Sequence, residues 1–317
     1  MRTRPPTAAD HDALVHLVNR GALGGEGDVE DKPRDALITE LTAPTLDADR
    51  DLRLWLDDAG AIAAFARLRR EPVDGGTDGR LLYTIRDGDA AARALEREVV
   101  TWAARRLCEA AAPRRRLIHA VSVRDPARAD RLAGLGFAPL RRRHTMVRDL
   151  TGALPDAPPP DGIRIRPCRG AADAEAYVAV FNAAFADSLD FSPLTVAEFL
   201  HDVAAPDYRP HRDAVAEARD GTLAGHCFVV VDASQPRRGY VASLGVAPGH
   251  RRTGLGAALL AAALHRLRAD GVTEAYLNVD VDSPTGAPRL YQRLGFTVGF
   301  VETRLALDEP GVVALAA

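Results

Sequence analysis

The stretch "VASLGVAPGHRRTGLGAALLAAALHRLRADG", residues 241–271, contains the most informative pattern of the chain. It begins as an extended apolar run, turns at Pro248 and Gly249, and then repeats leucine and alanine at helical spacing. Gly254 and Gly256 stand where that helix begins, although glycine costs roughly 1 kcal/mol against alanine within a helix. A strand, a basic turn and a helix in this order predict a layered α/β domain.

The two glycines have a physical explanation in the chemistry of helix starts. The first turn of a helix presents unpaired N–H groups and a partial positive charge, and glycine leaves these groups accessible to an anion. The pattern therefore predicts a cradle for a phosphate or diphosphate. Close packing of helix on strand, with no ligand, is the alternative, and it explains one glycine better than two glycines that follow Arg251 and Arg252. The segment lacks the Gly-Lys-Ser/Thr of a P-loop and the third glycine of a dinucleotide fingerprint.

The chain also contains an internal repeat. Each half opens similarly, with "RTRPPTAAD" at 2–10 and "RIRPCRGAAD" at 164–173. Each closes on "LGF", at 135–137 and 294–296, so an offset of 159 relates the final thirds of the two halves. A repeat of this length indicates two similar domains in tandem. We expect a first domain at 1–150, a proline-rich linker at 151–162 and a second domain at 163–317.

Within the second half the sequence pattern predicts the order of helices and strands. We expect a mixed-sheet α/β (α+β) domain with a helical region at 171–203, strands at 213–220 and 223–233 joined by a hairpin turn, a strand at 240–246, a helix at 254–269, a strand at 274–281, a short helix at 287–294 and a last strand at 297–307. The helix at 254–269 has one apolar face, formed by Leu255, Leu259, Leu260, Ala263, Leu264 and Leu267. Gly271 is its expected stop.

Composition narrows the class of protein. The 317 residues carry a formal net charge of −3, which argues against a nucleic-acid partner. Three dispersed cysteines without metal-ligand spacing predict neither a disulfide framework nor a metal site. The start of the chain lacks the pattern of a signal peptide, and no apolar run approaches the 18 or more residues of a membrane span. These features predict a cytoplasmic protein with no membrane partner.

The glycine-rich segment resembles a known family. "LGVAPGHRRTGLGAALL" is similar to the acetyl-CoA motif Arg/Gln-x-x-Gly-x-Gly/Ala of the GNAT superfamily of N-acetyltransferases, with Arg251, Gly254 and Gly256 at its three positions. "SPTGAPRLYQRLGF" resembles the next motif of that superfamily, and the tandem layout resembles two-domain actinobacterial members of the mycothiol-synthase type. The resemblance implies two tandem GNAT-like acyl-CoA N-acyltransferase domains, with acetyl-CoA as cosubstrate and no metal.

The resemblance also implies cofactor-binding positions. The family's fourth strand carries a bulge, and its amides at Leu244, Gly245 and Val246 would contact the pantetheine arm and the thioester carbonyl. Ser283 stands where the family usually has asparagine. The complete expected set is Leu244, Gly245, Val246, Arg251, Arg252, Thr253, Gly254, Leu255, Gly256, Ala257 and Ser283.

For the chemistry, Tyr291 matches the tyrosine that protonates the departing thiolate in the family. The sequence does not identify the general base that accepts the proton of the amine. Tyr240 stands where related proteins have an acidic residue, and His226, Asp280 and Asp282 are further candidates, each of which could equally be a structural side chain.

The first half departs from the cofactor motif. With the offset of 159, Arg251, Gly254 and Gly256 fall on Ala92, Leu95 and Arg97, and Tyr291 falls on Leu132. Leu95 and Arg97 are large where bare amides are needed, and an Asp-Gly-Asp segment at 87–89 brings negative charge before the helix. We therefore expect 1–150 to be a degenerate, non-catalytic domain.

The expected acceptor is a primary amine of a small molecule, which attacks directly in a ternary complex. Mycothiol synthesis, transfer from a charged tRNA and a non-enzymatic acyl-CoA sensor are the alternatives. A monomer or a homodimer fits the tandem layout.

Overall fold

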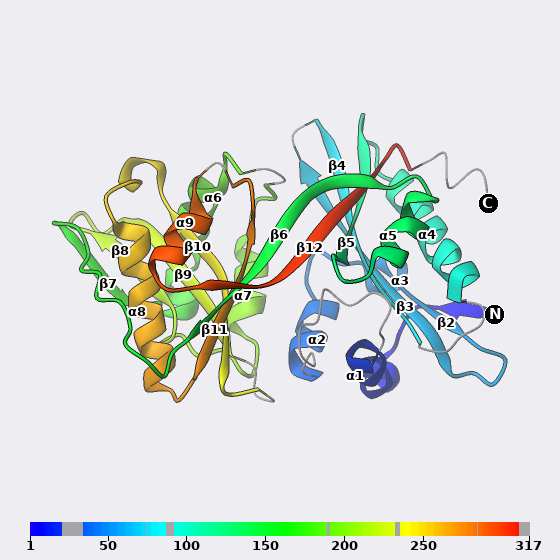
Figure 1. The fold of residues 1–317 in the computed structure, drawn as a ribbon, viewed down its shortest axis with the longest axis horizontal. Helices are drawn as coiled ribbons and strands as arrows, with labels where there is room; N and C mark the ends of the chain where they lie inside the picture. Colours follow the sequence, from blue (N-terminus) through cyan, green and yellow to red (C-terminus); the bar gives the residue numbers. More distant parts are fainter. Residues whose placement is uncertain are drawn as a thin grey trace. The chain divides into compact units, whose positions relative to one another are not determined.

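The computed structural model describes residues 1–20, 34–73, 75–86, 92–188, 191–231, 235–283 and 285–310. The chain forms two compact units, one of residues 1–143 with the chain from Phe300 onward, and one of residues 144–299. The ribbon in Figure 1 shows a sheet with helices in each of them. The α/β fold class expected from the sequence is confirmed.

The second unit contains most of the elements that the sequence predicts. Its helices and short 3-10 turns are η2 (Gly170–Asp173), α6 (Ala174–Phe185), α7 (Val196–Val203), η3 (Pro248–His250), α8 (Leu255–Ala269) and α9 (Ala287–Arg293). Its strands follow the order β6 (Ala138–Asp149), β11 (Glu274–Asp280), β10 (Arg238–Val246), β9 (Leu223–Val231), β8 (Ala214–Ala218) and β7 (Ile163–Pro167). The predicted hairpin is confirmed, because β8 and β9 pair antiparallel.

Helix α8 begins and ends as the sequence predicts. Its N-cap is Gly254 at φ +90°, and Gly271 follows its end at φ +84°, both in the left-handed region that favours glycine. The predicted apolar face is buried in the core against strands β8, β9 and β10. Burial of that face, together with the glycine stops, fixes the position of the first helical turn.

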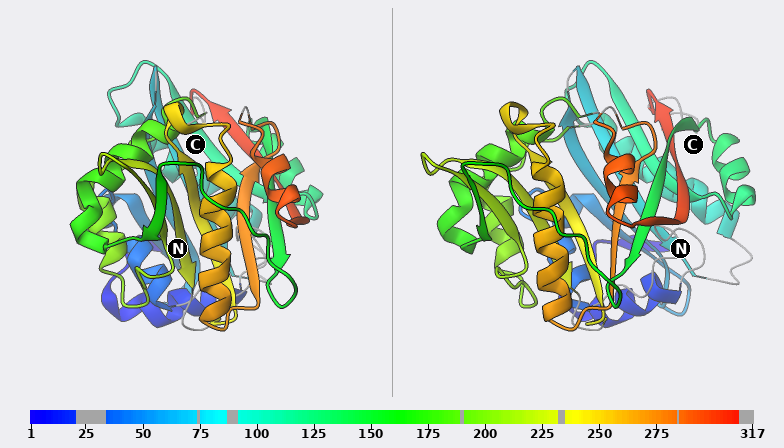
Figure 2. Two further views of the ribbon diagram at one scale, coloured as in Figure 1. Left: turned by 90° about the vertical axis from the view of Figure 1, so that its left-hand side faces the viewer. Right: turned by 60° about the vertical axis from the view of Figure 1, so that its left-hand side comes forward.

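Helices cover both faces of this sheet, as Figure 2 shows. On one face a Cβ at Gly225 would lie 2.9 Å from Leu259 of α8. On the other face a Cβ at Gly245 would lie 2.9 Å from Ala184 of α6. These two glycines let the helices pack directly on the strands.

The first unit repeats the arrangement. Its helices are η1 (Ala8–Asp10), α1 (His11–Arg20), α2 (Arg34–Leu41), α3 (Ala48–Asp51), α4 (Ala92–Cys108) and α5 (Pro126–Ala133). Its strands follow the order β1 (Arg2–Arg4), β2 (Leu52–Leu56), β3 (Ile62–Val73), β4 (Gly76–Ile85), β5 (Arg115–Ser122) and β12 (Thr297–Asp308). One core lies under α4 and a smaller one under α1 and α2.

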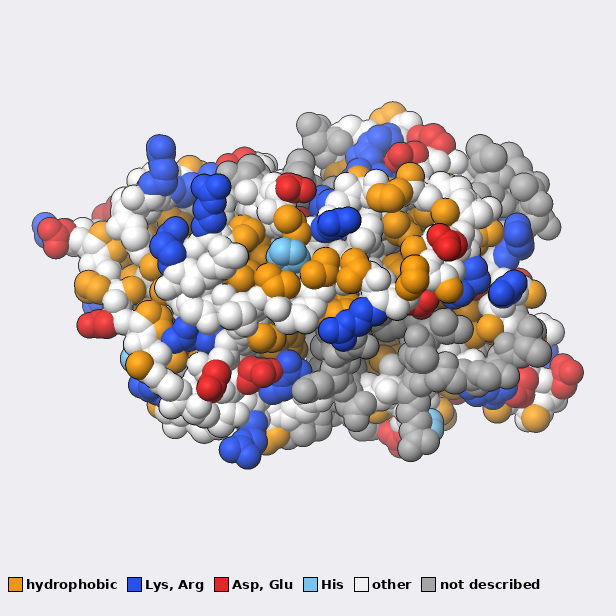
Figure 3. Space-filling model, viewed as in Figure 1, with side chains coloured by type: hydrophobic (Ala, Val, Ile, Leu, Met, Phe, Trp, Pro, Cys, Tyr) orange, Lys and Arg blue, Asp and Glu red, His pale blue; other side chains and the backbone are white. Residues whose placement is uncertain are grey.

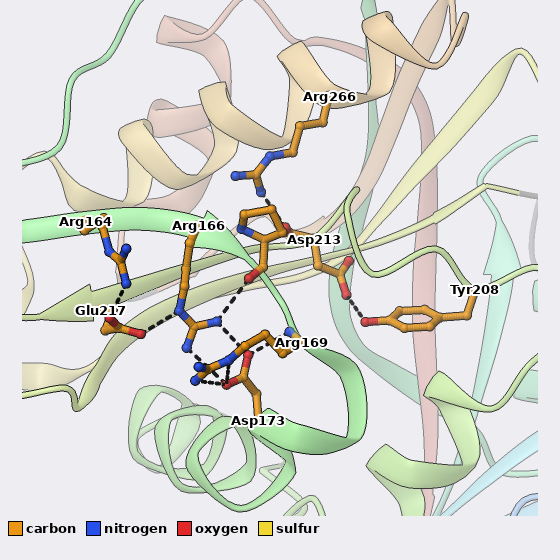
Figure 4. A network of polar contacts seen from close by, with 9 residues as sticks. Arg164, Arg166, Arg169, Asp173, Tyr208, Asp213, Glu217 and Arg266 are labelled. Atoms are coloured by element: carbon orange, nitrogen blue, oxygen red, sulfur yellow. Dashed lines mark hydrogen bonds and ion pairs between the residues drawn. The ribbon is translucent and has the colours of Figure 1, made fainter.

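The repeated openings "RTRPPTAAD" and "RIRPCRGAAD" form the same structure in both units. The guanidinium of Arg4 donates two hydrogen bonds of 2.7 Å to Asp10, and that of Arg166 donates bonds of 2.7 and 3.0 Å to Asp173. Figure 4 shows the second of these clusters, in which Arg166 also bonds Glu217 of β8. Each cluster joins the first strand of a unit to the turn before its first long helix.

The division of the chain differs from the expected boundaries. Residues 151–162 form neither helix nor strand, as expected of a linker, but they belong to the second unit, where Arg268 of α8 donates to the carbonyl of Gly152. The last strand, β12, pairs with β5 of the first unit. Residues 144–149 of β6 conversely lie in the second unit. The two repeats have thus exchanged their final strands, which the sequence pattern does not reveal because both strands have similar alternation.

Several further features concern the described residues only. None of their helices combines the length and apolar character needed to cross a bilayer. No group of three or more metal-ligating side chains occurs among them, and Cys108, Cys168 and Cys227 are free thiols. On the face seen in Figure 3, basic and acidic side chains are interspersed with apolar ones.

Candidate active site

The candidate site begins where two parallel strands separate. Strands β10 and β11 pair from Arg238↔Glu274 to Val241↔Leu277, whereas β10 continues to pair with β9 as far as Val246. Among the described residues, β10 beyond Val241 therefore has a partner strand on one side only. An opening of this kind leaves backbone N–H and C=O groups available to a ligand.

The bulge expected on this strand lies earlier than the family resemblance implies. The register with β9 shifts between Val241 and Ser243, so the extra residue is Ala242. Gly245 has a different reason to be glycine, because a Cβ there would lie 2.4 Å from the ring of His226. Leu244, Gly245 and Val246 follow the bulge in the separated part of β10, where a bulge re-aims the backbone.

The first turn of α8 adjoins the end of β10 and is open. No side chain caps the helix at Gly254, and the amides from Thr253 to Ala257 have no hydrogen-bond acceptor among the described residues. Arg252, at φ +63°, precedes them in a conformation that costs a non-glycine residue of order 1–3 kcal/mol. These open amides lie where the sequence predicts an anion cradle.

Gly256 differs from Gly254. A Cβ at Gly256 would lie 3.4 Å from Leu290 and 3.7 Å from Val246, which is ordinary contact. Gly254, by contrast, has open space around it and a positive φ. The backbone conformation requires the first glycine, and accessibility of the amides explains the second.

The side chain of Arg251 does not point freely into the cradle. Its guanidinium forms a bidentate ion pair with Asp187, at 2.5 and 2.9 Å, and donates to the carbonyls of Ala184 and Val246 at 3.0 and 3.3 Å. Asp187 raises the pKa of Arg251 through these hydrogen bonds. Arg251 therefore ties the end of α6 to the end of β10, whereas the neighbouring Arg252 is exposed.

Tyr291 lies on α9 against the core of the second unit. It is 8% exposed, and its ring packs against Phe296 at a centroid distance of 5.9 Å. Burial raises the pKa of this phenol well above 10, so the hydroxyl keeps its proton at neutral pH. Ser283, before α9, lies 3.0 Å from the hydroxyl of Thr285.

Tyr240 belongs to a polar chain that sequence reasoning missed. Asn278, the first residue of β11 beyond the paired stretch, directs its amide nitrogen to the Tyr240 hydroxyl at 3.4 Å. The hydroxyl of Thr145 donates to the Asn278 carbonyl oxygen at 2.7 Å. Tyr240 also stacks on Tyr276, with centroids 4.9 Å apart. An asparagine within the apolar pattern "YLNVDV" was the available signal for this chain.

His226 is enclosed by aromatic side chains. It is 0% exposed, with the rings of Tyr177, Phe181 and Phe185 at 4.8, 5.4 and 6.0 Å. Neither ring nitrogen has a hydrogen-bond partner among the residues that the structure describes. Burial lowers the pKa of His226 to about 3, so the imidazole is neutral. As it stands, the ring is out of contact with any molecule in solvent.

The remaining acidic candidates follow strand β11. Asp280 is the last residue of the strand and half-buried, and its carbonyl accepts from the amide of Ser283 at 3.2 Å. Asp282 is exposed in the turn that follows. Both lie at the end of β11 that has separated from β10.

The first unit requires a correction to the sequence alignment. Helix α4 begins at Ala92, so Leu95 and Arg97 lie within the helix and do not form the turn before it. The offset of 159 holds between Phe137 and Phe296, and it is 163 between the helix starts Ala92 and Leu255. The counterpart of the phosphate turn, including the Asp-Gly-Asp segment, lies outside the described residues.

Comparison with known proteins shows the family to which the chain belongs. A family model described as the acetyltransferase (GNAT) family matches residues 179–296. A protein of Streptomyces coelicolor named mycothiol acetyltransferase is 31% identical over 294 residues, which cover 92% of this chain and 89% of that protein. One of the same name from Thermobispora bispora is 38% identical over 176 residues, 54% of this chain and 59% of the relative, so that alignment covers less than two thirds of the relative's length.

Solved structures share the fold of the whole chain. A GCN5-related N-acetyltransferase from Sphaerobacter thermophilus has a TM-score of 0.72 at 24% identity, covering 97% of this chain and 95% of that one. A tandem GNAT protein from the clavulanic acid biosynthesis pathway has a TM-score of 0.71 at 16% identity, covering 97% and 98%. This chain belongs to the GNAT family of acetyltransferases, in its tandem form. The family consists of acyltransferase enzymes that use acyl-CoA.

Proposed function

We propose that the second unit transfers an acetyl group from acetyl-CoA to a primary amine of a small molecule. The observation that carries this proposal is the separation of β10 from β11 after Val241, directly before the bare first turn of α8. The opening accepts an extended pantetheine arm, and the turn accepts the diphosphate at one end of it. Open amides at both places supply the hydrogen bonds that an extended ligand needs.

The residues fit the two ends of acetyl-CoA. The amides from Arg252 to Ala257 would hold the diphosphate, with the exposed guanidinium of Arg252 beside it. The backbone from Leu244 to Val246 would face the thioester, and an amide aimed at the carbonyl oxygen stabilises the negative charge that develops there. Arg251 acts by holding the turn against α6.

The transfer needs one proton acceptor and one proton donor. The amine nitrogen attacks the thioester carbon, a C–N bond forms, the C–S bond breaks, and the thiolate receives a proton from the hydroxyl of Tyr291. The phenol of Tyr291 is protonated at neutral pH and can donate, and burial, which raises its pKa, makes the phenolate that remains quick to regain a proton. The amine proton passes to solvent water, with the Tyr240 hydroxyl, which adjoins Asn278 at the opening, as the relay. Half-buried Asp280 is the alternative acceptor, and enclosed His226 would need the end of α6 to move.

A specific observation favours one acceptor among small amines. The relatives described above, one of them aligned along nine tenths of this chain, are named mycothiol acetyltransferase. Mycothiol acetylation is therefore the second candidate function. Related proteins of the mycothiol-synthase type have an acidic residue near the start of this strand, where this chain has Tyr240. This difference argues for another small amine over mycothiol synthesis.

Release of the free thiol from acetyl-CoA, measured against a panel of amines that includes the mycothiol precursor, tests the proposal. Replacing Tyr291→Phe is expected to lower kcat about 100-fold or more, in the range for loss of a general acid, while calorimetry shows coenzyme A binding within twofold of wild type. Tyr276→Phe, which removes the same hydroxyl group from a tyrosine of strand β11, is the matched control.

Two outcomes would contradict the proposal. Equal turnover of Tyr291→Phe and wild type would remove the acid from the mechanism. Tight binding of acetyl-CoA with no thiol release for any amine would instead favour a non-enzymatic acyl-CoA sensor.

A further inference from the structure

Outside the candidate active site, arginines gather on one face of the first unit's sheet. The strand register places Arg69 of β3 directly opposite Arg80 of β4, and Arg80 beside Ile118 of β5. Ile118 in turn faces Ala306 of β12, two residues from Arg304. Since residues two apart share a face, Arg69, Arg80 and Arg304 lie on the same face.

Strand β6 adds two more arginines. Arg143 lies 3.5 Å from Glu302 of β12, and Arg141, two residues before it, shares its face. These five arginines form one cluster. Glu71 lies beside Arg69 and Arg80, and Glu302 lies beside Arg143. Like charges directly opposite on neighbouring strands are destabilising.

Arg304 is the least compensated member. Its side chain is 14% exposed, its nearest recorded carboxylate oxygen is that of Glu302 at 4.0 Å, and it makes no hydrogen bond to the described residues. Glu302 is shared with Arg143. Burial lowers the pKa of Arg304 to about 10, and the charges of Arg143, Arg80 and Arg141 act in the same direction. A buried cation without a hydrogen-bonded partner is expensive.

Part of the cluster is exposed to solvent. The residue opposite Arg304 on β5 is the small Ala120. The side chains of Arg69, Arg80 and Arg143 are 44%, 29% and 18% exposed, so the cluster is reachable from solvent. The nearby Arg67 and Arg116 have carboxylates of their own, in Glu40 and Asp78.

We propose that this face of the first unit binds a small anion carrying at least two charged oxygen groups, held by Arg80, Arg143 and Arg304. Guanidinium groups match phosphate and carboxylate oxygens with paired hydrogen bonds. An anion there would bring negative charge to Arg304, whose nearest recorded carboxylate oxygen lies 4.0 Å away. The site is independent of the transferase function proposed above and lies entirely within the first unit.

Calorimetric titration with pyrophosphate and with citrate, at an ionic strength held constant with sodium chloride, tests the site. At least one of the two is expected to bind saturably and to raise Tm, and the preferred one tells phosphate from carboxylate. Arg304→Gln is expected to weaken that binding at least tenfold. Arg142→Gln is the matched control, because Arg142 is exposed and lies between Arg141 and Arg143 on the opposite face of β6.

A second prediction for Arg304→Gln does not depend on pyrophosphate or citrate. Without added anion, Arg304→Gln is expected to have a higher Tm than wild type, since it removes a buried and poorly compensated charge. Saturable binding that is equal in wild type and Arg304→Gln would overturn the proposal, and so would stabilisation by sodium chloride alone.

Pyrophosphate has a second place to bind, at the first turn of α8. The titrations are therefore repeated with saturating coenzyme A and with Arg252→Gln, which alters that turn. Binding that persists under both conditions and is lost in Arg304→Gln supports the anion site of the first unit. Binding that disappears in Arg252→Gln and survives in Arg304→Gln assigns the anion to the coenzyme turn and refutes the inference.

Discussion

In each unit a pair of parallel strands separates after four paired residues, but the side chains at the two openings differ. In the first unit residues 77–80 of β4 pair with 115–118 of β5, and in the second unit residues 238–241 of β10 pair with 274–277 of β11. The offset is 161 for the first strand of each pair and 159 for the second. The backbone opening is therefore a property of the repeat.

In the first unit, side chains bridge the opening. His119, the first residue of β5 beyond the paired stretch, lies with Nδ1 2.8 Å from the carbonyl oxygen of Leu81, and Arg128 donates to its Nε2 at 2.9 Å. In the second unit the last paired residue of β11 is Leu277, an apolar side chain on the core face. Asn278 lies on the opposite face, where its amide turns to Tyr240.

Side chains at neighbouring positions also differ between the two units. Tyr83 donates to Glu96 at 2.7 Å and carries the guanidinium of Arg128 over its ring at 4.5 Å. The counterparts of Tyr83 and Arg128 at offsets of 161 and 159 are Leu244 and Ala287, which are smaller and uncharged. A buried polar network thus occupies in the first unit positions that correspond to the proposed coenzyme site of the second unit. This supports the proposal that the first unit is non-catalytic.

The largest expected effect comes from breaking the network of the first unit. Arg128→Met leaves His119 without its donor and removes a cation within 3.6 Å of Glu96. Loss of one partner from a buried charged cluster costs about 3–5 kcal/mol, so we expect the free energy of unfolding by urea to fall by that order. Turnover per folded molecule should remain within twofold of wild type.

Arg131→Met is the control for this experiment, because Arg131 also pairs with Glu96 but is 24% exposed, and its loss should cost less. A large drop in turnover at unchanged stability would mean that the first unit takes part in the chemistry.

The next largest effect is expected when the large side chains that close the opening of the first unit are introduced into the second unit. Ala287→Arg together with Leu244→Tyr places the two large side chains of the first unit at the positions proposed to face coenzyme A. We expect coenzyme A affinity to fall about 100-fold, equivalent to roughly 2.7 kcal/mol, as measured by calorimetry. Ala257→Ser, at the proposed diphosphate turn, adds one hydroxyl and serves as a mild control. Unchanged affinity of the double variant would show that the pantetheine arm lies elsewhere.

The smallest effect concerns the enclosed histidine of the second unit. The pKa of His226 is about 3 in the folded protein and 6.5 as the ordinary value. Between these values the unfolded chain binds a proton that the folded chain does not, so its contribution to stability is present above pH 6.5 and is lost as pH falls toward 3. The slope is at most about 1.4 kcal/mol per pH unit.

His226→Leu is therefore expected to reduce the loss of stability between pH 7 and pH 5 by about 1–2 kcal/mol relative to wild type, as measured by urea unfolding at both values. Asp213, whose pKa burial raises to about 7, acts in the opposite sense in both proteins, so the difference between them is diagnostic. An unchanged difference would mean that the imidazole is already protonated in the folded protein. Retained turnover in the variant would remove His226 from the candidate bases.

The sequence by itself determined the tandem repeat, the α/β class, the limits of α8 and the open amides at its start. These are local properties, since helical spacing, a positive φ at Gly254 and the absence of Cβ are set by residues close together in the chain. The family motif added Tyr291 and the segment from Leu244 to Val246.

Only the tertiary structure decided the rest. It placed the bulge at Ala242, engaged Arg251 with Asp187, enclosed His226 and joined Tyr240 to Asn278. It also exchanged the final strands of the two repeats and closed the first opening with side chains from β4, β5, α4 and α5. Each of these depends on which distant segments meet, and pairing between strands of similar alternation is fixed by the packing of the whole unit and carries no local signature.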